Sequence, residues 1–164
     1  MGKTVELTQG EMQTAALTGV TRATSDAELL WKNWPSMGWG SFIEQAGAEL
    51  AVGKLTGRWV DFDRRHVGPW AVRYGNEVFE NDDDLDVIIF VSGEAPSYEV
   101  QGWLYAHEAK RKENWDNARW VHAFLIPWDE LHPLETLPSG RSSSRLPAGV
   151  KATCQDDGIP EFTR

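Results

Sequence analysis

The spacing of apolar residues predicts a helical N-terminal segment. Three places match the capping box, in which a Ser or Thr and a Glu three residues later bind each other's backbone N–H: Thr8 with Glu11, Ser25 with Glu28, and Ser41 with Glu44. We therefore expect helices over about 9–22, 26–34 and 42–55. Pro35 ends the second helix, and Gly57 ends the third.

After residue 57 the pattern changes from helical spacing to the alternation typical of strands. Short strands are expected over 58–62 and 70–74. The continuous apolar run 86–92 predicts a central strand that is buried on both faces. A short turn containing Gly and Pro then favours a hairpin with the following strand. The remaining pattern predicts a strand over 98–104, a helix over 106–117 and a strand over 120–126.

This order of elements predicts a mixed α/β (α+β) fold in a single domain, 1–137. A helical N-terminal segment would precede a core over 42–126 with the order αβββαβ and a mixed sheet. Residues 138–164 are rich in Ser, Gly, Pro and Arg, and this composition predicts an extended or disordered tail.

Acidic residues occur at three places in this core. Asp86 opens the 86–92 strand, Glu99-Val100-Gln101 lies on the next strand, and Glu49 lies on the third helix. This order and spacing resembles the PD-(D/E)XK superfamily of restriction-endonuclease-like nucleases. That family has an Asp at the start of one strand, Asp or Glu, any residue and Lys on the next, and often an acid on the preceding helix. The resemblance implies a nuclease with Asp86, Glu99, Gln101 and Glu49 at its catalytic site.

Two neighbouring carboxylates suit the hydrolysis of DNA phosphodiester bonds. Hard oxygen ligands bind Mg²⁺, and the metal acidifies water and stabilises the charge that develops on phosphate. Glu99 and Gln101 are two residues apart on a strand, so their side chains share a face, and Asp86 is expected to approach Glu99 near the strand ends. We predict that Asp86 and Glu99 bind Mg²⁺, that Gln101 positions the attacking water, and that Glu49 assists.

Two positions depart from the family pattern. Gln101 stands in place of Lys and supplies no positive charge, and Leu85 stands where a Pro is expected. A second register on the earlier hairpin would put His66 and Ala71-Val72-Arg73 at the motif, without carboxylates, and would predict an inactive domain. The alternative is that Asp86 only starts its strand, while Glu99 and Gln101 form a solvated strand face.

Four short segments also resemble uncharacterised proteins of tailed bacteriophages: Ala48-Glu49-Leu50-Ala51-Val52, Val67-Gly68-Pro69-Trp70-Ala71-Val72-Arg73, Gly102-Trp103-Leu104 and Ala123-Phe124-Leu125-Ile126-Pro127. This resemblance, over about 15–137, implies a viral origin and a role in the cytoplasm of an infected bacterium. It does not supply a reaction.

Charge changes this picture, because 16 Lys and Arg against 25 Asp and Glu give the 164-residue chain a net charge of −9. Such a balance argues against a non-specific nucleic-acid coat, which needs a basic stripe. Six acids fall within residues 77–86. They predict either a solvated loop or an acidic surface that binds a host protein. The spacing of Asp82, Asp84 and Asp86 begins like a calcium loop, but the required Gly is absent.

The other candidate features have both structural and functional interpretations. The run Lys110-Arg111-Lys112 could contact DNA phosphates or form a solvated helix face. Most of the nine Trp are expected in the core. The single Cys154 cannot form an internal disulfide, and no apolar run reaches the ~18 residues of a membrane helix. We expect a cytoplasmic protein that is a metal-dependent nuclease or, alternatively, a non-catalytic acidic protein that binds or inhibits a host defence or nucleic-acid-handling protein.

Overall fold

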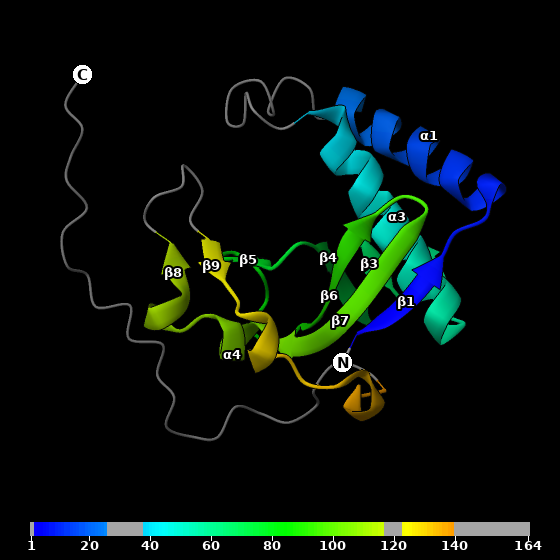
Figure 1. The fold of residues 1–164 in the computed structure, drawn as a ribbon. Helices are drawn as coiled ribbons and strands as arrows, with labels where there is room; N and C mark the ends of the chain where they lie inside the picture. The colour runs from blue at the N-terminus through cyan, green and yellow to red at the C-terminus, as the bar shows by residue number, and fades with distance from the viewer. Residues whose placement is uncertain (1, 26–37, 117–122, 140–164) are drawn as a thin grey trace, which may run out of the picture.

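A curled, mixed six-stranded sheet organises the fold (Figure 1). The structure is a computed structural model that describes residues 2–25, 38–116 and 123–139. Within the sheet β4 runs parallel to β6, and the other neighbours are antiparallel. In spatial order its strands are β1 (Lys3–Glu6), β7 (Ser97–Tyr105), β6 (Val87–Glu94), β4 (Trp70–Tyr74), β3 (His66–Val67) and β2 (Val60–Asp61).

The buried strand predicted from the continuous apolar run is confirmed as β6. Val87–Val91 are all buried, and β6 lies between β4 and β7. The alternation expected in the 70–74 strand is also present, because Trp70 and Val72 face one core cluster while Ala71 faces another. By contrast, the 58–62 strand is shorter than expected, and β1 and β3 are strands that the pattern did not predict.

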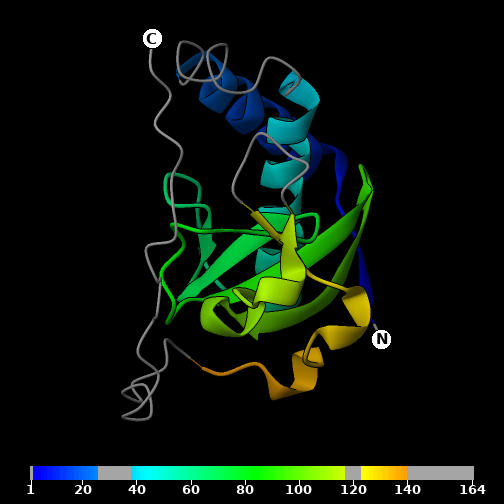
Figure 2. The same cartoon turned by 90° about the vertical axis from the view of Figure 1, so that its left-hand side faces the viewer.

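The long helix α3 (Trp39–Thr56) covers one face of this sheet, and a second long helix, α1 (Gln9–Ser25), packs on α3 (Figure 2). We call this the helix-covered face. The helices approach closely because α1 has Gly19 at the contact, where a Cβ would lie 2.6 Å from the backbone of Ile43. On the sheet side, α3 buries small residues such as Ala48 and Ala51 against the strands. These small residues permit close packing of α3 on the strands.

Local signals placed α1 correctly and α3 less well. The Thr8 N–H donates to Glu11 Oε2 at 2.6 Å and the Glu11 N–H donates to Thr8 Oγ1 at 3.3 Å, which confirms that capping box. The box expected at Ser41 is wrong, because α3 begins three residues before Phe42, with Gly38 as N-cap and no side-chain cap. Its C-terminal Gly57 does adopt a left-handed conformation, with φ 65°. The helix predicted over 26–34 lies outside the described residues.

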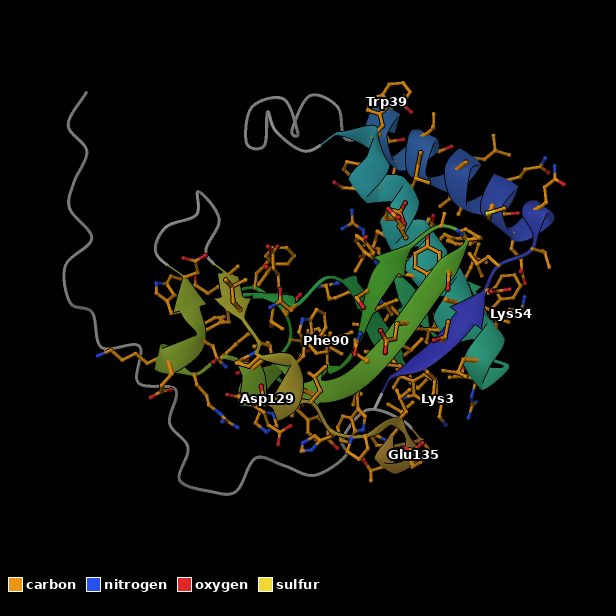
Figure 3. All side chains as sticks on the ribbon, viewed as in Figure 1. Lys3, Trp39, Lys54, Phe90, Asp129 and Glu135 are labelled. Carbon is orange, nitrogen blue, oxygen red and sulfur yellow. The ribbon has the colours of Figure 1, made fainter. Side chains whose placement is uncertain are left out.

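A second, smaller layer lies on the opposite face of the large sheet. Phe90 of β6 packs there with Val78 and Ile126 (Figure 3). The layer holds a three-stranded antiparallel sheet and one short helix: β5 (Glu77–Phe79), β9 (Ala123–Leu125), β8 (Trp115–Asp116) and α4 (Ala106–Ala109). Of the described part of the predicted 106–117 helix, only Ala106–Ala109 is α-helical, and Lys112–Asn114 forms a 3₁₀ turn. The last predicted strand, β9, belongs to this smaller sheet, so the expected order αβββαβ is not continued in the large one.

The segment 127–139 packs against one end of the large sheet and forms no long helix or strand. It contains two 3₁₀ turns, Trp128–Glu130 and Leu134–Thr136. The buried Trp103 indole N–H donates to the Pro133 carbonyl at 3.1 Å, and the Trp70 indole donates to Pro138 at 2.8 Å. Lys3 and Glu135 form an ion pair at 3.1 Å beside it (Figure 3). Residues 140–164 of the predicted tail lie outside the described residues.

Candidate functional site

The register of the β6–β7 hairpin decides where the predicted metal ligands lie. Asp86 precedes β6, and its carbonyl accepts the N–H of Ala106 at 2.9 Å, just beyond the end of β7. Glu99 faces Ser92, which is about 20 Å further along β6 at the rise of an extended strand. Asp86 and Glu99 therefore lie at opposite ends of the hairpin. The expectation that they approach each other is not met.

Glu99 and Gln101 do share a face of the sheet, as predicted. The register shifts at Phe90 and Val91, which leaves Gln101 as the extra residue of a β-bulge. Its side-chain amide donates to Ser92 Oγ at 2.7 Å, and Ser92 is the residue paired with Glu99. Nevertheless, within 2–25, 38–116 and 123–139 no group of three or more His, Cys, Asp or Glu is arranged to hold a metal ion.

Glu49, the fourth predicted site residue, lies on the helix-covered face. Its side chain is fully buried. Arg22 of α1 donates to both carboxylate oxygens, at 3.0 and 2.8 Å, and Gln45 donates to Oε1 at 2.9 Å. Glu99 points to the opposite face, because its neighbours Tyr98 and Val100 pack in the cluster that α3 covers. The structure therefore separates Glu49 from Glu99 and Gln101.

The Glu49 network joins four parts of the fold. Gln45 donates from Nε2 to the Val72 carbonyl at 3.0 Å and accepts the Tyr74 N–H at 2.9 Å, so it binds α3 to β4. Arg22 also donates to the Phe62 carbonyl in the turn between β2 and β3, and its guanidinium lies over the Phe62 ring. These contacts give Glu49 a structural role, since each of its oxygens accepts a donor from the chain itself.

A second polar pair, in which the tyrosine is buried and the carboxylate is half-buried, lies between α3 and β7. The Tyr98 hydroxyl donates to Glu44 Oε2 at 2.7 Å, and the Tyr98 ring meets Tyr74 edge to face. Burial, and then the hydrogen bond to Glu44, raise the pKa of Tyr98 far above its usual value. Burial and the charges of Glu44 and Glu94 also raise the pKa of Tyr74. Both hydroxyls therefore stay protonated at neutral pH and act as hydrogen-bond donors.

The acidic segment 77–86 is largely bound to the rest of the chain. Asp82 forms an ion pair with Arg73, and Asp84 accepts Lys110 Nζ at 2.7 Å. The Lys110 side chain is consequently only 16% exposed. Asp82 and Asp84 thus take separate cationic partners, and Lys110, the first residue of the basic run, is paired with an acid.

Three arginines occur instead around the β2–β3 hairpin, at one edge of the large sheet. Residues 58–65 contain Arg58, Arg64 and Arg65 against two acids. Residues 77–99 contain no Lys or Arg and the following acids: Glu77, Glu80, Asp82, Asp83, Asp84, Asp86, Glu94 and Glu99. Charge is therefore segregated along the sheet. Sequence reasoning missed this basic segment, although three Arg within eight residues is a readable signal.

Trp59 lies within this basic segment and is 83% exposed. Its carbonyl accepts the Gly68 N–H at 2.8 Å, which extends the β2–β3 ladder by one residue. The next residue, Val60, packs on Gly53 of α3. Because side chains alternate along a strand, the Trp59 ring points away from the helix pair.

Arg58, which directly precedes Trp59, and Arg64, which follows in the same hairpin, are also exposed. Arg64, at the hairpin tip, is 81% exposed and only 3.9 Å from its acidic neighbour Asp61. Arg58 lies over the Trp70 ring. We refer to Arg58, Trp59 and Arg64 as the hairpin-edge surface.

The other described tryptophans differ in exposure. Among the six that the structure describes, Trp70 and Trp103 are buried at 5% and 6% exposure. Trp39 is 55% and Trp128 is 42% exposed, and Figure 3 shows Trp39 at the end of the helix pair. Trp31, Trp34 and Trp120 lie outside the described residues. Exposed tryptophans at separate places are typical of contact surfaces.

An open cavity of about 460 Å³ lies between α1 and the turn after β2. Its lining includes Arg22, Arg65 and the hydroxyls of Thr18, Thr21 and Ser25. These groups also have partners within the chain: Arg22 binds Glu49, and the Thr21 and Ser25 hydroxyls donate to helix carbonyls at 2.8 and 2.9 Å. We therefore assign no ligand to this cavity.

Comparison with known proteins gives no further constraint. No protein-family model matches the chain, and neither the curated proteins nor the solved structures give a significant match. The nuclease and phage resemblances therefore stay predictions. Among the helices that the structure describes, none has the length and apolar character needed to span a membrane.

Proposed function

We propose that this protein is a non-catalytic binding protein that contacts a macromolecular partner through the hairpin-edge surface. The observation that carries the proposal is the 83% exposure of Trp59 in a hairpin that also exposes Arg58 and Arg64. Trp and Arg are the residue types most enriched at binding hot spots. A tryptophan on a protein surface is costly in solvation, and nothing in the packing of β2 requires one at this position.

Further support comes from the predicted catalytic residues. Asp86 lies at the open end of the β6–β7 hairpin and Glu99 lies near its turn, and Glu49 is neutralised by Arg22. Among the described residues, a nuclease centre would have to form from carboxylates on two faces of the sheet. Binding without catalysis requires no such convergence. If the phage resemblance is correct, the partner would lie in the cytoplasm of an infected bacterium.

Capture from a bacterial lysate, followed by reconstitution, tests the proposal. Immobilised wild type, Trp59→Ser and Trp128→Ser are compared for both bound protein and bound nucleic acid. Trp128 is also exposed but lies in the 127–139 segment, so Trp128→Ser is the matched control. We expect a partner that wild type and the control retain and Trp59→Ser loses. The purified partner should then bind Trp59→Ser at least about 5-fold more weakly, the effect of losing 1 kcal/mol. Equal binding by all three would refute the proposal.

The metal-dependent nuclease with a restriction-endonuclease-like core is the alternative prediction. Its support is the mixed sheet behind a helix that carries Glu49, together with Glu99 and Gln101 on one face. Calorimetric titration of wild type and Asp86→Ala with Mg²⁺ and then Mn²⁺ separates the two functions. Heat of metal binding that Asp86→Ala abolishes would favour the nuclease. If the protein is non-catalytic, we expect no heat of metal binding that depends on Asp86.

A further inference from the structure

The charge of the hairpin-edge surface limits the class of partner that it can bind. Arg58 and Arg64 are exposed, and the remainder of the acidic chain, above all residues 77–99, repels anions. At physiological ionic strength the Debye length is about 8 Å, so an anion that touches the hairpin experiences mainly the charges of residues 58–65, which are three Arg against Asp61 and Asp63. Charge complementarity thus favours an anionic partner that makes a local contact, and disfavours one that would extend over the acidic strands.

The shape around Trp59 distinguishes between anionic partners. Its ring extends from the edge of the sheet on the side away from α3. The open cavity between α1 and the turn after β2 lies on the opposite side, beside Phe62. An exposed ring is a platform for a flat aromatic group. A nucleic-acid base offers such a face, and base–aromatic stacking contributes about 1–3 kcal/mol per base.

We infer that the hairpin-edge surface binds single-stranded nucleic acid: one base stacks on Trp59, and Arg58 and Arg64 contact neighbouring phosphates. This inference rests on the proposed function and names its partner. A single strand is required because a duplex hides its base faces in the stack. The surface is small, so it covers only a few nucleotides. Two phosphate contacts predict a salt dependence with a slope of about −1.4 in log K against log salt.

Fluorescence anisotropy with labelled oligothymidine of about 20 nucleotides tests the inference on the full chain. Trp59→Ala is expected to weaken binding about 5- to 150-fold, the equivalent of one lost stacking contact. The double variant Arg58→Gln/Arg64→Gln should bind more weakly at low salt and lose most of the salt slope. Trp59→Phe, which keeps an aromatic face, should restore much of the affinity. A duplex of the same length should compete poorly.

Trp128→Ala is the matched control, because it removes another exposed indole and should leave binding unchanged. Circular dichroism and urea denaturation of each variant show whether the fold is retained, and Trp59→Phe keeps the test valid if Trp59→Ala does not fold. Absence of oligothymidine binding by wild type at low salt, or equal loss in Trp128→Ala, would overturn the inference. If a captured protein still depends on Trp59, only the nucleic-acid inference fails. If no partner depends on Trp59, the proposed function fails as well.

Discussion

The helix-covered face and the hairpin-edge surface use the same residue types in opposite ways. On the helix-covered face, the Arg22 side chain is only 11% exposed and is bonded to Glu49, and the aromatic Tyr98 is buried and bonded to Glu44. At the hairpin edge, Arg64 and Trp59 are more than 80% exposed. The type of a charged or aromatic residue therefore does not by itself indicate a function. Their availability to a partner distinguishes the two regions, and this is a property of the packing.

The buried Arg22–Glu49 pair should show the largest effect on stability. Arg22→Met leaves the Glu49 carboxylate buried without its cation, which is expected to lower the free energy of unfolding by about 3–5 kcal/mol. The double variant Arg22→Met/Glu49→Met replaces both charges with apolar groups and should recover most of that loss. Urea denaturation of the three proteins measures both effects. A loss below about 1 kcal/mol in the single variant would mean that solvent reaches the pair.

Gly47 offers a smaller change on the same face. A Cβ at this position would lie 2.0 Å from the Tyr98 hydroxyl oxygen, which is held by Glu44. Gly47→Ala should therefore destabilise the protein by about 1–3 kcal/mol through overpacking, even though Ala is the better helix former. Gly40→Ala in the same helix, where nothing lies within 4 Å, is the control and should be neutral or stabilising. Matching effects of the two substitutions in thermal denaturation would show that the Tyr98 contact is not tight.

The Tyr98–Glu44 pair also predicts a limited pH dependence. Because the folded-state pKa of Tyr98 is raised above its unfolded value, its contribution is fully present below about pH 10. Above that pH the unfolded chain releases the proton and the folded chain keeps it. The free energy of unfolding should then fall by up to about 1.4 kcal/mol per pH unit for this group. Tyr98→Phe should make the alkaline limb shallower than in the matched variant Tyr105→Phe. Parallel limbs in urea titrations would contradict the assignment.

How much the sequence predicts depends on whether the signal is local. The capping box of Thr8 and the apolar run of β6 describe their own segments, and both elements were predicted. The strand β1 was missed because it has only one buried residue, Val5, and acquires its strand character by pairing with β7.

The expected approach of Asp86 to Glu99 was wrong for a reason that the sequence already contained. In an antiparallel hairpin, residues pair at equal distances from the turn, and Glu94 pairs with Ser97. Glu99 is close to that turn and Asp86 is far from it, so the two carboxylates could not meet. The exposure of Trp59 had no such signal, because the sequence does not show which tryptophans the tertiary packing will cover.

The smallest effect on the free energy of unfolding is expected at the hairpin edge. A small effect there would show that the fold does not need the Trp59 side chain. Trp59→Ser removes a side chain that is already 83% exposed, so the free energy of unfolding should change by no more than about 0.5 kcal/mol. Trp103→Ser removes a ring that is 6% exposed and should cost about 3–5 kcal/mol. Urea denaturation compares the two variants directly. If Trp59→Ser were as destabilising as Trp103→Ser, Trp59 would belong to the core and the fold itself would explain its presence. A near-zero change leaves its large apolar ring without a structural purpose, which is the condition under which a surface tryptophan points to a partner.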